Sequence, residues 1–244
     1  MPGHDSSARS TLSNAVKRQV DALGNADDAK ILQRFFKTGP GEYGEGDVFV
    51  GVKVPPLRAL AKQHADLGLV ELDELLASPV HEHRSLALII LANRAKRSGL
   101  EEGKELYDFY LARTDRINNW DLVDVSCRDV VGGHLLAIRD CEPLGALARS
   151  ELIWDRRIAI VSTWTFTRAG NLAPCFAISE QLLGDKEDLM HKAVGWMLRE
   201  AGKKDEAALE AFLRENAPRM PRTALRYSIE RMTPERRAYW RSQK

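Results

Sequence analysis

Residues 81–90, HEHRSLALII, open with four polar side chains and continue into small and apolar ones. Leu86, Ile89 and Ile90 recur at the spacing of one helical face. Similar starts follow at NWDL (119–122), WDRR (154–157) and MHKA (190–193), separated by about 35 residues. A fixed period of this size is typical of a solenoid, in which each helix pair buries its apolar face against its neighbours.

The rest of the sequence also favours an all-α fold. Alternating strand patterns are nearly absent, and turn signals divide the chain into about a dozen short helical pieces. These signals are Gly39-Pro40-Gly41, Ser98-Gly99, Gly132-Gly133, Gly170-Asn171, Gly184 and Met220-Pro221. We therefore predict a curved α-solenoid of HEAT-like helix-pair repeats, whose inner helices line a concave face suited to a long ligand such as duplex DNA. We expect residues 1–244 to form one domain, with about the first eight residues disordered.

Composition narrows the classes of partner. The chain is 44% hydrophobic, enough for a sizeable core, and its 36 Lys and Arg nearly balance its 35 Asp and Glu, so a polyanion partner must be argued from local clusters. Cys127, Cys141 and Cys175 lack the spacing of a disulfide framework or a zinc site. No segment reaches the roughly 20 apolar residues of a membrane span. We expect a cytoplasmic monomer without metal or cofactor.

A glycine-rich connection, GPGEYGEGDVFVGVKVPPLR (39–58), interrupts the helical rhythm. Pro55 suits the first turn of a helix. The connection fits a surface loop that caps the N-terminal helices, and it equally fits contact with a nucleic-acid backbone through Lys53 and Arg58.

The segment RINNWDLVD (116–124) has the pattern of a helix start. Asn118 and Asp121 fit a capping box, Ile117 and Leu122 fit a hydrophobic staple, and Asp121 therefore looks structural. Trp120 and Asp124 are four residues apart, which places an indole and a carboxylate on one helical face. The helix dipole favours the ionised carboxylate. On this spacing alone, Asp124 fits a cap or an ion-pair partner better than a catalyst, and Trp120 equally fits the core.

Later repeats add Arg157 and Trp196 to equivalent helices, from which they could project onto the same strip. Together the motifs WDLVD (120–124), WDRRIAI (154–160) and KAVGWMLRE (192–200) make the chain resemble the AlkD-type family of DNA alkylation repair glycosylases, built from HEAT-like repeats. Residues 34–55 are also similar to the family's N-terminal region, so the resemblance covers nearly the whole chain.

The resemblance implies an enzyme that removes alkylated purines from DNA. Asp124 matches the family's catalytic aspartate, Trp120 and Trp196 match two tryptophans that flank the lesion's sugar, and Arg157 matches an arginine beside them. The family is expected to reach the sugar while the lesion stays stacked, in contrast to enzymes that extrude the base.

Other cationic side chains are candidates for contact with DNA phosphates, although a helix-surface ion pair is the commoner role for such residues. These candidates are Arg156, Lys192, Arg199, Lys53 and Arg58. Trp154, Trp164 and Trp240 are interpreted as packing residues. The alternative function is a noncatalytic repeat protein that binds nucleic acid or protein through its concave face.

Overall fold

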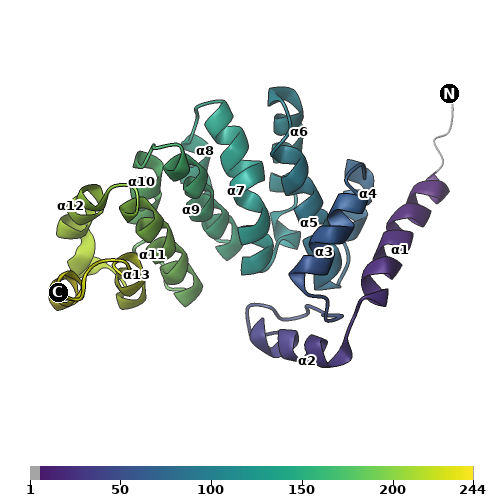
Figure 1. Ribbon diagram of the computed structural model, residues 1–244, viewed down its shortest axis with the longest axis horizontal. Coiled ribbons are helices and arrows are strands. Elements are labelled where there is room, and N and C mark those ends of the chain that lie inside the picture. Colours follow the sequence, from purple (N-terminus) through teal and green to yellow (C-terminus); the bar gives the residue numbers. More distant parts are fainter. Residues whose placement is uncertain (1–5, 244) are drawn as a thin grey trace. The chain divides into compact units, whose positions relative to one another are not determined.

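The computed structural model describes residues 6–243, with side chains from residue 12 onward, and within that range it is all-α (Figure 1). It contains fourteen α-helices, two 3-10 turns and one isolated parallel bridge, Val48–Val80, but no β-strand among the residues it describes. The all-α, solenoid-like class is therefore confirmed. The curvature of the solenoid and its concave face stay predictions, and the disorder expected at the N-terminus falls largely on residues 1–5, which lie outside the described range.

The chain divides into two compact units, residues 1–126 and 127–244. The first unit holds α1 (Ser6–Ala22), α2 (Ala26–Phe35), α3 (Val54–Gln63), α4 (Leu69–Leu76), α5 (His81–Ala95), α6 (Leu100–Leu111) and the turn η1 (Thr114–Arg116). Helix α7 (Trp120–Ala137) begins in the first unit and ends in the second. The second unit continues with α8 (Glu142–Leu147), α9 (Ile153–Arg168), α10 (Ala173–Gln181), α11 (Asp188–Gly202), α12 (Glu206–Asn216), η2 (Ala217–Arg219), α13 (Arg222–Ser228) and α14 (Pro234–Ser242). The expectation of a single domain stays a prediction.

Helix α5 is the centre of the first unit, because α3 and α4 both pack against it and every residue from His81 to Ala92 is buried. A helix that is buried on all sides must satisfy its polar groups internally. The first turn of α5 does so through Glu82, whose carboxylate accepts the backbone N–H groups of Val50, Gly51 and Val52 at 3.1, 2.8 and 3.1 Å.

The connection between α2 and α3 is therefore fixed to the core. Besides its bonds to Glu82, it buries Phe49 and Val52 at 5% and 4% exposure. Gly51 has a φ of +86°, and a Cβ there would lie 2.1 Å from the carbonyl oxygen of Asn25. Pro55 lies in the first turn of α3, as predicted.

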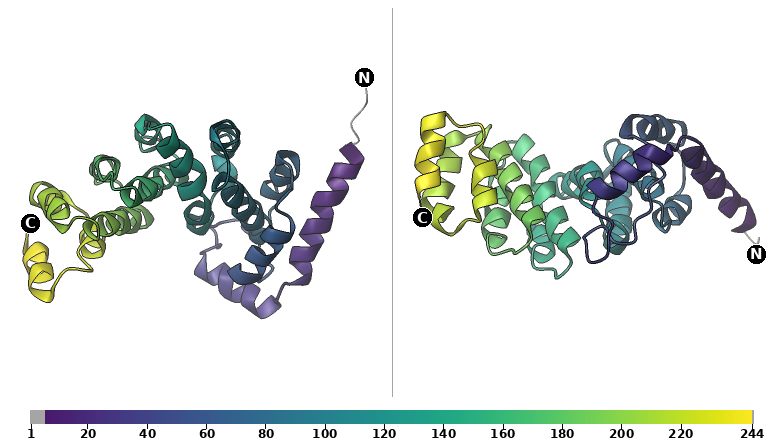
Figure 2. Two further views of the ribbon diagram at one scale, coloured as in Figure 1. Left: turned by 45° about the horizontal axis from the view of Figure 1, so that its top comes forward. Right: turned by 90° about the horizontal axis from the view of Figure 1, so that it is seen from below.

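In the second unit, α9 packs against α11, and α11 packs against α13 (Figure 1). Figure 2 shows the helices of this unit lying beside one another in two further views. Close approach depends on small residues: a Cβ on Gly195 of α11 would lie 2.5 Å from the carbonyl oxygen of Ala224 in α13. Stacked helix pairs of this kind bury their apolar faces only against neighbours.

The helix starts predicted from the repeated motifs are confirmed to within two residues, since α5, α7, α9 and α11 begin at His81, Trp120, Ile153 and Asp188. The turn predicted at Gly132-Gly133 is wrong, because both glycines lie inside α7. A Cβ on Gly132 would lie 2.6 Å from the carbonyl oxygen of Ser162 in α9, so glycine serves close helix packing there. Within the described range, no helix is both long and apolar enough to span a bilayer.

Candidate active site

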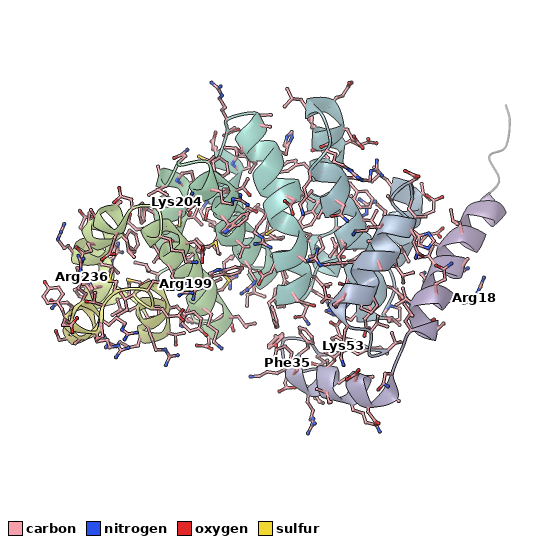
Figure 3. All side chains as sticks on the ribbon, in the orientation of Figure 1. Arg18, Phe35, Lys53, Arg199, Lys204 and Arg236 are labelled. Atoms are coloured by element: carbon pink, nitrogen blue, oxygen red, sulfur yellow. The ribbon has the colours of Figure 1, made fainter. Side chains whose placement is uncertain are left out.

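Trp120 is the first residue of α7, and an aromatic cluster fixes its indole. The ring stacks on Phe36 at a centroid distance of 5.1 Å and meets Phe35 edge-on at 5.9 Å. Its Nε1–H donates a hydrogen bond to the hydroxyl oxygen of Tyr43 at 3.2 Å. Phe35, labelled in Figure 3, ends α2, and Tyr43 lies in the connection that follows. With one edge hydrogen-bonded and two rings packed against it, the indole is held in one orientation while remaining partly exposed.

The aromatic cluster continues inward to a buried histidine. Phe36 stacks on Phe49 at 5.1 Å, and Phe49 stacks on the ring of His81 at 4.4 Å. His81 lies between two carboxylates: Nδ1 is 3.1 Å from Asp47 and Nε2 is 2.8 Å from Asp121. The start of α5, the connection after α2 and the start of α7 therefore meet at one side chain.

The charges of this group are mutually stabilising. Burial alone lowers the pKa of His81, but the charge and hydrogen bond of Asp121, together with those of Asp47, outweigh it and raise the pKa to about 9. Burial also raises the pKa of Asp47, yet the hydrogen bond from His81 and the charge of Arg84 bring it below its ordinary value. Arg84 donates to Asp47 at 2.5 Å. At neutral pH, His81 is therefore a cation whose two ring N–H groups donate to two anions.

The start of α7 differs from the predicted capping box. The helix begins at Trp120, and the residue before it is Asn119, which is fully buried and accepts the Trp120 N–H at 2.8 Å. Asn118 instead directs its amide toward Asp47 at 3.4 Å. Because the helix starts one residue later than the capping box requires, Ile117 and Leu122 lose the spacing of a staple, although both are fully buried. Asp121 is structural, as predicted, through its bond to His81.

Asp124 follows Trp120 by four residues in α7, so the two side chains lie on one face of the helix. The carboxylate is partly buried. A fixed indole and a carboxylate one turn apart form the part of the candidate site that lies in residues 1–126.

Arg157 and Trp196 lie in the second unit, on the adjacent helices α9 and α11. Arg157 is only 5% exposed, and its Nη1 donates to the carbonyl oxygen of Leu189, in the first turn of α11, at 3.0 Å. Trp196 is partly exposed. Trp120 and Asp124 therefore lie on one face of α7, and Arg157 and Trp196 lie on the neighbouring helices α9 and α11. The convergence of all four residues stays a prediction.

The five further cations predicted to contact DNA differ in whether they already form ion pairs and hydrogen bonds within the protein. Arg156 is the most engaged, because it pairs with buried Asp185 at 2.7 Å and also donates to two backbone carbonyls. Lys53, Lys192 and Arg199 each have a carboxylate partner, in Asp28, Asp188 and Glu230 respectively. Lys53 and Arg199 are labelled in Figure 3. Arg58 is exposed and forms no ion pair with any residue between 12 and 243. Contact of these five side chains with phosphate stays a prediction. Arg58 is the one that would give up no ion pair with residues 12–243 in order to bind phosphate.

Sequence reasoning missed Phe35, Phe36 and Tyr43 as neighbours of Trp120. The signal was weak, because it consisted of two adjacent phenylalanines at a helix end and a tyrosine in a glycine-rich loop. Among the tryptophans interpreted as packing residues, Trp154 and Trp240 are buried, which confirms that role. Trp164 is partly exposed and lies beneath the guanidinium groups of Arg128 and Arg168. Across the described side chains, no group of three His, Cys, Asp or Glu residues is arranged to hold a metal ion.

Comparison with known proteins adds two findings. The model of a family described as "DNA alkylation repair enzyme" matches residues 16–232 of this chain. A solved structure described as a predicted DNA alkylation repair enzyme from Enterococcus faecalis is similar with a TM-score of 0.69 and 19% identity, covering 87% of this chain and 98% of that one. At this identity the likeness shows a shared fold. A comparison with curated proteins gave no match.

Proposed function

Because this chain belongs to the family of DNA alkylation repair enzymes, we propose that it hydrolyses the N-glycosidic bond of purines alkylated at N3 or N7 in duplex DNA. Family membership supports a role in the repair of alkylated DNA. The observation that carries the finer proposal is the fixed indole of Trp120 one helical turn before the carboxylate of Asp124.

The reaction requires little acid catalysis from the protein. Alkylation at N3 or N7 places a positive charge on the base, which makes it a good leaving group. As the glycosidic bond breaks, positive charge moves onto the deoxyribose, as in the oxocarbenium-like transition states of glycoside hydrolysis. A catalyst for this step needs negative charge near the sugar more than it needs a proton donor.

Asp124 is proposed to supply that charge. A carboxylate held beside the developing cation stabilises it electrostatically, and the same oxygen atoms can orient the water that attacks the anomeric carbon. It lies in the second turn of α7, one turn after Trp120.

Trp120 and Trp196 are proposed to flank the sugar with their π faces. An indole face attracts a cation by roughly 0.5 to 2 kcal/mol, depending on desolvation. That attraction favours both the charged lesion and the sugar that acquires charge. The hydrogen bond to Tyr43 and the packing against Phe36 keep the Trp120 ring from turning away. Arg157, which is 5% exposed, is proposed to contact a phosphate beside the lesion.

The test is release of 7-methylguanine from methylated duplex DNA by the intact protein and by Asp124→Asn. We expect the variant to lose about two to three orders of magnitude in rate, because the substitution keeps the shape of the side chain and removes its charge. Thermal melting of both proteins checks that the variant is folded.

Asp121→Asn is the matched control, since it makes the same chemical change three residues earlier in the same helix. Asp121 bonds to His81, which supports Trp120 through Phe49 and Phe36, so we expect this variant to melt at lower temperature and to lose much less of its rate at 25 °C than Asp124→Asn. Equal release by the intact protein and Asp124→Asn, or release by neither, would contradict the enzymatic proposal. That outcome would favour a noncatalytic protein that binds nucleic acid or protein.

A further inference from the structure

Two arginines share one tryptophan in the second unit. The guanidinium carbon of Arg128, in α7, lies 4.7 Å from the centroid of the Trp164 ring, and that of Arg168, at the end of α9, lies 5.0 Å from the same ring. Trp164 and Arg128 are partly exposed and Arg168 is exposed. We call these three residues the arginine–tryptophan cluster.

The charges of the cluster, on Arg128 and Arg168, have no carboxylate partner among residues 12–243, the part of the chain whose side chains are described. Other arginines of the same unit behave differently: Arg219 pairs with Glu180, and Arg236 pairs with Glu206. Two like charges held at one ring repel each other, and the ring offsets only part of that cost. Anions bound to the two guanidinium groups would remove the rest.

Contacts between α7 and α9 hold the backbone that carries the cluster. The Thr165 hydroxyl donates to the carbonyl oxygen of Arg128 at 2.6 Å, and Ser162 donates to that of Cys127 at 3.3 Å. Gly132 lets α7 and α9 approach to the distance at which a Cβ would clash. A guanidinium that rests its face on an indole keeps its in-plane N–H donors for other partners. The cluster therefore holds two sets of donors in place.

The position of the cluster along the helices relates it to the candidate active-site residues. Arg128 follows Asp124 by four residues in α7, and Trp164 follows Arg157 by seven residues in α9. Both spacings place the later residue on the same helical face as the earlier one. A duplex whose damaged nucleotide reaches Asp124 would place its neighbouring backbone near Arg128, one turn further along the same helix.

We propose that Arg128, Trp164 and Arg168 form a binding site for the DNA backbone next to the damaged nucleotide, with each guanidinium bound to a phosphate and Trp164 orienting both. This inference rests on the proposed function. The cluster supplies affinity and register, whereas it takes no part in breaking the glycosidic bond.

The experiment measures the dissociation constant for undamaged duplex DNA as a function of salt, for the intact protein and for Arg128→Gln/Arg168→Gln. We expect the double variant to bind at least about tenfold more weakly at moderate salt, because it loses two charged hydrogen-bond donors. The slope of log Kd against log salt should fall by about two, since each lost phosphate contact removes about one unit.

Arg219→Gln/Arg236→Gln is the matched control, because it removes the same two charges from arginines that already have carboxylate partners. Its slope should stay within about half a unit of that of the intact protein. Trp164→Leu keeps both charges but loses the ring, so we expect weaker binding, with recovery in Trp164→Phe. An unchanged slope in the cluster variant, or equal losses in cluster and control variants, would overturn the inference.

Kinetics separate this inference from the proposed function. We expect Arg128→Gln/Arg168→Gln to raise KM for methylated duplex DNA and to leave kcat within about twofold, because the cluster binds without reacting. Asp124→Asn should lose kcat and keep the salt slope of binding. Loss of kcat in the cluster variant would overturn the binding role, whereas absence of base release by the intact protein would overturn only the enzymatic proposal.

Discussion

At the scale of single residues, His81 links the segments around the candidate site, because its ring bonds to side chains from two of them. It is buried at 2% exposure and bonds to Asp47 on one side and Asp121 on the other. A buried cation between two anions is costly to leave half-paired, because each remaining charge would keep its desolvation penalty. The orientation of Trp120 depends on this group through Phe49 and Phe36.

The raised pKa of His81 predicts a pH-dependent stability. The folded state holds the proton up to about pH 9, whereas an unfolded histidine releases it near pH 6.5. The stabilisation is therefore fully present below about pH 6.5 and is lost as pH rises through about 9, with a total on the order of 3 kcal/mol. Urea unfolding between pH 6 and 10 measures it.

The variant that tests this prediction is His81→Gln, and His64→Gln is its control. His64 is partly exposed and its ring bonds to the neutral amide of Gln19 rather than to a carboxylate, so its variant should reproduce the slope of the intact protein. His81→Gln should be less stable at pH 6, and its stability should change less between pH 7 and 9. Parallel curves for His81→Gln and the intact protein would show that His81 does not bind the proton.

Residue-scale prediction from sequence succeeded where a side chain interacts within its own helix. Trp120 and Asp124 could be placed on one face from their spacing, and Asp121 could be assigned to structure. The partner of Asp121 could not be predicted, because His81 is forty residues away in the chain. The helix cap moved from Asn118 to Asn119 for the same reason, since Asp47, in a distant loop, engages the Asn118 amide.

At the scale of helices, hydrophobic periodicity and polar starts predicted where the central helix of each repeat begins. Such signals are local, so a sequence contains them directly. Gly132-Gly133 shows the limit of this approach, because glycine is both a turn residue and a residue that lets two helices approach. Only the presence of α9 beside α7 identifies the second use.

These two glycines provide a test of helix packing. A Cβ on Gly132 would lie 2.6 Å from the Ser162 carbonyl oxygen and 2.7 Å from the Thr165 hydroxyl, whereas one on Gly133 would meet nothing nearer than 4.0 Å. We expect Gly132→Ala to lower the free energy of unfolding by about 1–3 kcal/mol through overpacking. Gly133→Ala should raise it by about 0.5–1 kcal/mol, because alanine favours helix. Similar effects of the two substitutions on urea unfolding would contradict this account of α7 packing.

At the scale of the whole chain, α7 belongs to both compact units, since it begins at Trp120 and the division falls after Ser126. A helix loses hydrogen bonds on both sides of a break, so one half of α7 is unstable without the other. We expect one cooperative thermal transition, with calorimetric and van't Hoff enthalpies that agree. Two resolved transitions would show that the units unfold independently.

The composition of the whole chain does not show which of its cations are already paired with carboxylates. The net charge of +1 excludes attraction to DNA by overall charge alone. Ion pairs occupy many of the cations, as Arg156 and Arg219 illustrate. The distinction between a paired and an unpaired arginine depends on tertiary contacts, which is why the sequence suggested Arg156 and overlooked Arg128.

The contact of His81 with Asp47 and Asp121 also has a consequence for how related sequences diverge. A chain that replaces one of the three side chains leaves the others with uncompensated charge inside the protein, so single replacements should be selected against. Because Asp47 also accepts from buried Arg84, relatives are expected to keep all three, or to exchange them together with Arg84 for apolar residues of similar volume. Positions 47, 81 and 121 should thus be inherited as one unit, and their joint variation would mark lineages that rebuilt the support of Trp120.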